Sequence, residues 1–199
     1  NLAALALRLQ PGDEVVINDL DFPAGATPWL QESCPATARL WRHRAGALRV
    51  EDLIPLLGPR TRFVTTSLVS FFNGGMIPLD EVVAAVRRHS PALIGVDVTQ
   101  ALGRVPLALG DVDLIVSSTH KWILASHGGG LVGVPARSAD RWRVPAGGWF
   151  HLLDPFGPDR FEQARSKPGA AGFAVGMPNS PAIYAIRAAL QYIRGIGVA

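Results

Sequence analysis

Apolar residues along the chain fall into short continuous runs that alternate with amphipathic segments. The runs rich in Val, Ile and Leu predict strands at 14–17, 39–42, 62–69, 93–96, 114–116 and 131–134. Helix-like patterns occupy 1–9, 50–57, 79–89 and 183–193. Because the strands are apolar throughout, both faces of their sheet are expected to be buried. The pattern therefore predicts an α/β fold with a mostly parallel sheet and helices on both faces.

Local residue choices predict how some of these elements begin. Asp21–Gly25 is expected to be a loop, because Pro and Gly interrupt it. Thr27 is then expected to cap a short helix whose first residue is Pro28. The helix at 79–89 is expected to bury one apolar face, which carries Leu79, Val82, Val83 and Val86.

The residue composition of the chain changes at residue 145. Up to residue 144 the strand and helix patterns alternate, whereas 145–181 is rich in Pro and Gly and contains several aromatics. Such a long loop favours an arm that packs on a partner or on an active site. Residues 182–199 return to a helix, which is expected to lead to a C-terminal small domain. The chain opens and closes on helix patterns, so we expect a piece of a longer protein, interrupted at both ends.

Composition narrows the class of protein. The chain has 199 residues, 48% of them hydrophobic, which is enough for a sizeable core. No apolar run reaches the roughly 18 residues of a membrane helix. Its single cysteine, Cys34, excludes a disulfide framework or a Cys-based zinc site within one chain. The net charge of +3 is spread along the chain and does not indicate nucleic-acid binding. Without a signal-peptide pattern, a cytoplasmic location is expected.

Lysine is scarce in this chain. Of the 19 basic residues, only Lys121 and Lys167 are lysines and the rest are arginines. Because this chain uses Arg for most of its surface cations, a Lys in an apolar, Gly-flanked context indicates a chemical role that Arg cannot fill. Lys can lose its proton and act as a nucleophile or base, which Arg cannot.

Polar side chains follow two consecutive predicted strands. Asp97 and Gln100 come after one, and Ser118, His120 and Lys121 come after the next. In parallel α/β sheets ligands bind beyond the carboxyl ends of the strands. An acid and a lysine there suit pyridoxal phosphate (PLP), which needs a Lys for its imine and an acid to keep its pyridine nitrogen protonated.

The stretch V96-D-V-T-Q-A-L-G-R-V-P106, followed by D113-L-I-V-S-S-T-H-K-W122, resembles the signature of the class V aminotransferase family. That family includes cysteine desulfurases, selenocysteine lyases and isopenicillin-N-epimerase-like proteins. The resemblance covers essentially the whole chain. It implies the large domain of a fold-type I PLP enzyme, an amino-acid substrate and a homodimer. Lyase, desulfurase, epimerase and aminotransferase chemistry all remain open.

The resemblance also implies roles for single residues. Lys121 would hold PLP as a Schiff base and then act on the substrate Cα proton. Asp97 would pair with the pyridine nitrogen, and Gln100 would donate to the phenolic oxygen. The phosphate would meet Ser118 and His120, and the ring face would meet an aromatic residue, Phe22.

Other interpretations stand beside these roles. Asp97 is alternatively a helix cap, Ser118 a partner for a strand end, and Phe22 a core aromatic. A hydrolase triad of Ser118, His120 and Asp97 is disfavoured because the chain has no Gly-x-Ser-x-Gly elbow.

Two residues depart from the family pattern. Phe71 stands where the family often has Asn, and Met177 where it has a phosphate-binding Thr. They favour the alternatives of a catalytically silent homologue or a non-enzymatic dimerisation module.

Overall fold

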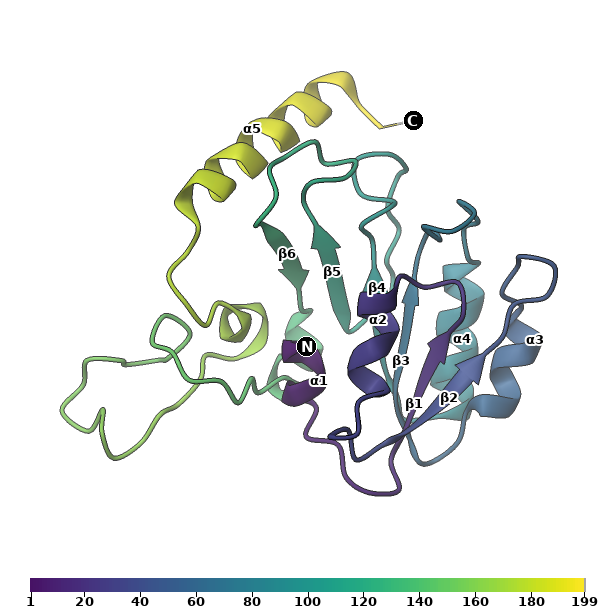
Figure 1. Ribbon diagram of the computed structural model, residues 1–199, viewed down its shortest axis with the longest axis horizontal. Helices are drawn as coiled ribbons and strands as arrows, with labels where there is room; N and C mark the ends of the chain where they lie inside the picture. The colour runs from purple at the N-terminus through teal and green to yellow at the C-terminus, as the bar shows by residue number, and fades with distance from the viewer. Residues whose placement is uncertain (199) are drawn as a thin grey trace.

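The computed structural model describes residues 1–198, and within them it forms one six-stranded sheet of order β2-β1-β3-β4-β5-β6 (Figure 1). The first five strands of the chain pair in parallel, whereas β6 runs antiparallel to β5. The predicted mostly parallel sheet is confirmed. The strands are β1 (Glu14–Asn18), β2 (Thr37–Trp41), β3 (Thr61–Ser67), β4 (Leu93–Asp97), β5 (Leu114–Ser118) and β6 (Gly130–Gly133).

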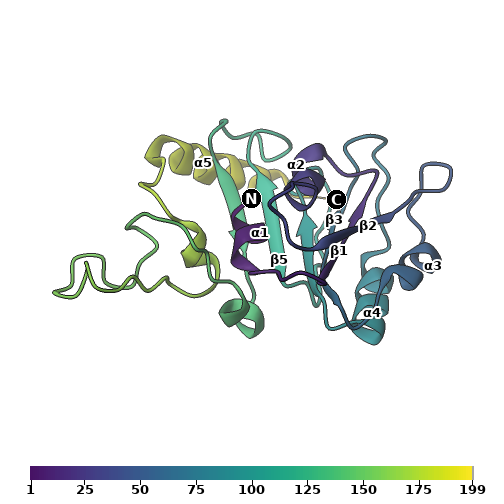
Figure 2. The ribbon, with the colours of Figure 1, turned by 60° about the horizontal axis from the view of Figure 1, so that its bottom comes forward.

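Helices cover both faces of the sheet. Figures 1 and 2 show α3 and α4 on one side and α1 and α2 on the other. Successive side chains of a strand point to opposite faces, and β1 shows the result. Val16 lies in the apolar cluster under α4, while Val15 and Ile17 lie in the cluster under α1. The helices are α1 (Leu2–Ala6), α2 (Pro23–Ala26), α3 (Val50–Leu53), α4 (Leu79–His89) and α5 (Ser180–Ile196).

The amphipathic pattern of α4 placed its boundaries correctly. Leu79, Val82 and Val86 are buried, as expected, and Ala85 joins them, whereas Val83 is only partly buried. Asp80 and Glu81 lie in its first turn and three basic residues in its last, which complements the helix dipole.

The segment after β1 corrects two local predictions. Asp21–Gly25 is not wholly a loop, because Pro23 opens the short helix α2. Proline has a backbone already suited to a first helical position. Thr27 caps no helix with its side chain and instead begins a 3-10 turn that ends at Trp29. Burial of that tryptophan, whose Nε1 donates to the Gly25 carbonyl at 2.9 Å, holds the segment in this coiled form.

Helix α5 lies across the carboxyl end of β5 and the amino end of β6, on the loop that joins them (Figure 1). Asn179 caps it by accepting a hydrogen bond from the Ala182 amide at 3.2 Å. Gly129 of the loop lies under the helix, where a Cβ atom would come within 2.9 Å of Ile186. The loop can therefore approach α5 this closely only with glycine at that position.

Residues 145–181 extend away from the sheet as a long arm (Figures 1 and 2). A 3-10 turn at Gly169–Phe173 and an isolated bridge between Leu152 and Ser166 are its regular features among the described residues. Phe156 and Phe161 are 75% and 89% exposed. The role of this arm as a dimer or active-site contact stays a prediction.

No helix in residues 1–198 is long and apolar enough to span a bilayer.

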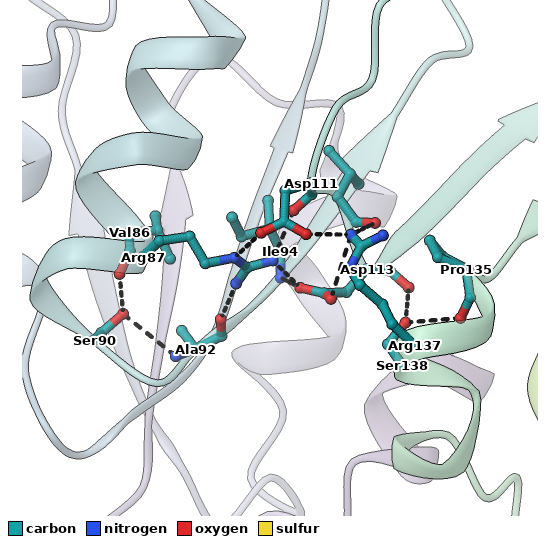
Figure 3. Close-up of polar contacts among 11 residues, drawn as sticks. Val86, Arg87, Ser90, Ala92, Ile94, Asp111, Asp113, Pro135, Arg137 and Ser138 are labelled. Carbon is teal, nitrogen blue, oxygen red and sulfur yellow. Dashed lines mark hydrogen bonds and ion pairs between the residues drawn. The ribbon is translucent and has the colours of Figure 1, made fainter.

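A charged network ties the elements together at the amino ends of β4 and β5 (Figure 3). Arg87 of α4 donates to Asp111 and to Asp113, both at 2.6 Å, and to the Ala92 carbonyl at 2.7 Å. Asp113 is buried and also accepts from the Ile94 amide at 2.9 Å. The hydrogen bond from Arg87 lowers the pKa of Asp111. The network fixes α4 against the strand that leads to Lys121.

We expect Asp113→Ala to lower the free energy of unfolding by about 3 kcal/mol, because it leaves a half-buried guanidinium short of its innermost partner. The matched variant Asp111→Ala removes a carboxylate that is 49% exposed and is expected to cost less than about 1 kcal/mol. Urea unfolding of both variants measures the difference. Equal losses of unfolding free energy in the two variants would show that the burial of Asp113 does not strengthen the network.

Candidate active site

A cavity of about 450 Å³ opens at the carboxyl ends of β4 and β5. Parallel strands bring their carboxyl ends to one edge, where ligands bind in this class of fold. Residues from five separate parts of the chain line the cavity. They include all six residues singled out from the sequence, namely Phe22, Asp97, Gln100, Ser118, His120 and Lys121.

Strand register brings the acid and the lysine together. Asp97 ends β4 and pairs with Val116 of β5, and the chain then continues from β5 into Lys121. The Lys121 side chain is exposed, and within residues 1–198 its ammonium forms no hydrogen bond or ion pair. The other lysine is committed elsewhere, since Lys167 Nζ donates to the Phe150 carbonyl at 2.7 Å. Lys121 is thus the amine available to a ligand in the cavity.

Thr99 is a site residue that the sequence reasoning missed. Its amide donates to Asp97 Oδ1 at 2.7 Å, and its Oγ1 accepts from the Ser118 amide at 3.0 Å. The contact joins the loop after β4 to the end of β5 and fixes the distance between the two strand ends. Thr99 also lines the cavity. Its position two residues after a strand-end Asp is the available signal, because Asp commonly bonds the backbone two residues on.

His120 stacks on His127 across the loop between β5 and β6. The ring centroids are 4.2 Å apart and the planes differ by 13°. Desolvation, followed by the nearby His127 and Lys121, lowers the pKa of His120. The lowered pKa favours the neutral imidazole at pH 7, which has one N–H donor and one acceptor nitrogen.

Aromatic and aliphatic side chains form the opposite wall. Phe22 and Phe71 meet edge to face with ring centroids 5.1 Å apart, and both line the cavity. Leu131 and Val132 of β6 add apolar surface. Phe22 is 54% exposed, so it is not a core aromatic, and its ring is available to a flat ligand.

A second carboxyl group, Asp21, lies next to Asp97 and was also missed. Its Oδ1 accepts from the Ser67 amide at 2.7 Å, and Ser67 pairs with Asp97 between β3 and β4. Burial, opposed by the hydrogen bonds from Ser67 and aided by the charge of Asp97, raises the pKa of Asp21 to about 6. Asp21 therefore ties the loop that carries Phe22 to the strand beside Asp97.

A model of the protein family described as aminotransferase class-V matches residues 1–199. The chain belongs to this family. A curated relative is a probable cysteine desulfurase of Mycolicibacterium paratuberculosis, which is 28% identical over 97% of this chain and 28% of that protein. The class V resemblance drawn from the Asp97–Lys121 motifs is thereby confirmed.

Two solved structures show the same fold. The cysteine desulfurase CsdA of Escherichia coli has a TM-score of 0.84 at 20% identity and covers 97% of this chain and 50% of its own. The C-DES variant K223A, with glycine covalently linked to its PLP cofactor, has a TM-score of 0.85 at 25% identity. That match covers 99% of this chain and 53% of the C-DES chain. The chain thus spans about half of these proteins and a smaller part of the curated relative.

The class V family is PLP-dependent, and the residues at this cavity fit PLP. Lys121 is a free amine, Asp97 a carboxylate with Oδ1 already held by Thr99, and Phe22 an exposed ring. Hydroxyl, amide and imidazole donors for polar groups of the cofactor come from Ser118, Gln100 and His120. Met177, at the second departure from the family pattern, is 76% exposed.

The raised pKa of Asp21 predicts a pH-dependent contribution to stability. Because the folded state binds the Asp21 proton more tightly than the unfolded state, neutral Asp21 stabilises the fold at pH 4 and this contribution is lost as pH rises through about 6. The free energy of unfolding of Asp21→Asn, relative to that of the natural protein, should therefore be about 2–3 kcal/mol higher at pH 7 than at pH 4. Chemical unfolding at both pH values measures the change. The exposed Asp19→Asn serves as the control, and a parallel gain there would contradict the assignment.

Proposed function

We propose that this chain forms the cofactor-binding part of a PLP-dependent enzyme that acts on an amino acid. One observation carries the proposal: Lys121 and Asp97, on neighbouring strand ends, line one cavity together with Gln100, Ser118 and His120. The named relatives support the same reaction family, because cysteine desulfurases are among them. The reaction branch, whether lyase, desulfurase, epimerase or aminotransferase, is left to parts of the protein beyond this cavity.

Lys121 has two tasks in this proposal. Its Nζ would hold the cofactor covalently, and the same amine, when free, would be the base that takes the proton from the substrate Cα. PLP, when bound, supplies an electron sink for the pair of electrons left on Cα. Both tasks require a lysine free of other partners, which is how Lys121 stands in this structure.

Asp97 would place its carboxylate beside the cofactor's pyridine nitrogen, which must hold a proton. An opposite charge within a few ångströms favours the protonated nitrogen. The amide of Thr99 fixes one carboxylate oxygen at 2.7 Å, so the carboxylate is oriented before any ligand arrives. The alternative of Asp97 as a helix cap is wrong, because no helix of the described residues begins between β4 and β5, and its carboxylate instead caps a turn through the Thr99 amide.

The remaining residues orient the cofactor. The proposed contacts are from Gln100 to the phenolic oxygen, from Ser118 and His120 to the phosphate, and from Phe22 to the ring face. Phe22 is braced edge to face by Phe71, a geometry that contributes about 0.5–1.5 kcal/mol in comparable aromatic pairs.

A catalytically silent homologue is the second candidate, and Phe71 is the observation that favours it. Its ring lines the cavity at the position where related proteins often carry Asn, and a phenyl ring donates no hydrogen bond to an oxygen. The two candidates differ in turnover and agree in cofactor binding. Exchange of the Cα proton of amino acids with solvent therefore separates them.

We expect Lys121→Ala to abolish covalent attachment of PLP. The protein is incubated with PLP, reduced with borohydride and digested, and the modified peptide is identified by mass spectrometry. Lys167→Ala is the matched control, since it removes the other lysine of the chain and is expected to leave the adduct unchanged. An adduct that survives in Lys121→Ala would mean that another amine holds the cofactor.

Asp97→Asn is expected to leave PLP bound but to slow Cα-proton exchange about 10- to 1000-fold, because the lost charge lowers the pKa of the pyridine nitrogen. Exchange is followed by proton NMR in deuterated water with a panel of L-amino acids. The exposed Asp140→Asn, outside the cavity, provides the comparison. Exchange at the unsubstituted rate in Asp97→Asn would remove Asp97 from the proposed role.

A further inference from the structure

The residue after Lys121 holds the side-chain amide of Gln100. Trp122 Nε1 donates to Gln100 Oε1 at 2.9 Å. An indole nitrogen only donates, whereas a glutamine amide both donates and accepts. The contact therefore fixes which way the amide faces: its oxygen points to Trp122, and its two N–H donors remain for the cavity that Gln100 lines.

The turn after β4 is shaped to receive this tryptophan. The Arg104 guanidinium lies 4.3 Å from the centroid of the Trp122 ring, close enough for a cation–π contact. Gly103 has a φ of +89°, and a Cβ atom there would come within 2.7 Å of the Trp122 carbonyl oxygen. Gln100 and Arg104 thus hold the indole, and Gly103 leaves room for the Trp122 carbonyl. We call these three residues of one turn the indole clamp.

Burial does not account for this arrangement. Trp122 is 41% exposed, so water is available to an indole N–H that leaves Gln100. The contact instead restricts a flexible side chain that would otherwise sample several rotamers. A donor already aimed at its ligand loses less freedom when the ligand binds.

We propose that Trp122 is a positioning residue that orients Gln100 so that its amide N–H groups donate into the cavity, toward the phenolic oxygen of PLP. This inference rests on the proposed function. Trp122 touches neither the cofactor nor the substrate in this scheme and acts only through Gln100. Lys121 and the residue that orients Gln100 are thus adjacent in the chain, so one short loop sets both groups.

The test compares Trp122→Phe, which keeps a ring for Arg104 but removes the indole N–H, with Gln100→Ala and the double variant. We expect the dissociation constant for PLP to rise about fivefold in Trp122→Phe and about tenfold in Gln100→Ala. The double variant should match Gln100→Ala, because the tryptophan has nothing left to orient. Trp149→Phe, with the same 41% exposure but in the arm, is the matched control and should leave binding unchanged.

A spectroscopic measurement reports on orientation alone. Loss of the N–H donated to the phenolic oxygen makes that oxygen hold a neighbouring proton more tightly. The pH midpoint of the visible absorbance of bound PLP should therefore rise in Trp122→Phe and in Gln100→Ala alike. An unchanged midpoint in Trp122→Phe, or additive losses of affinity in the double variant, would overturn the inference.

The hydrogen bond itself is tested without cofactor. The indole N–H resonance of Trp122, identified by its loss in Trp122→Phe, should move in Gln100→Leu in the PLP-free protein. An unmoved resonance would overturn the inference even where PLP binds. Conversely, failure of the unsubstituted protein to bind PLP overturns the proposed function, and the inferred donation to PLP with it, whatever the resonance does.

Discussion

Parallel pairing between β4 and β5 determines where everything else at the candidate site lies. The register that sets Asp97 opposite Val116 leaves both strands ending at the same edge, so the residues that follow each strand meet there. Thr99 then bonds the two ends directly, through Asp97 on one strand and Ser118 on the other. At the amino ends, Arg87 and Asp113 keep β5 in place against α4. The acid and the lysine therefore line the same cavity.

Much of this arrangement follows from the sequence, because apolar runs and strand-end polar residues carry strong signals. The runs around Val16 and Ile94 predicted buried parallel strands, and Asp97 and Lys121 predicted the edge where a ligand would lie. What escaped prediction depends on contacts between segments distant in sequence. The helix at Pro23 forms around a buried tryptophan, and Asp21 becomes a site neighbour only through Ser67, which is 46 residues away. Local residue patterns contain no information on such contacts.

The carboxyl groups at the two ends of the sheet have different kinds of partner. At the amino ends Arg87 forms ion pairs with both Asp111 and Asp113. At the carboxyl ends Asp21 accepts a hydrogen bond from the Ser67 amide, and no cation within residues 1–198 pairs with it, so its proton is retained to a higher pH. Within residues 1–198 Asp97 forms no ion pair, so its carboxylate would be free for the proposed contact with a ring nitrogen.

The contact between α5 and the loop after β5 has a mechanical consequence. Ile186 rests where Gly129 leaves no side chain, and the same loop contains His120, Lys121 and their stacked partner His127. The helix is long and stiff, whereas the loop beneath it is short and held at both ends by strands. Because Ile186 lies against Gly129, a tilt of α5 would displace the loop that carries Lys121.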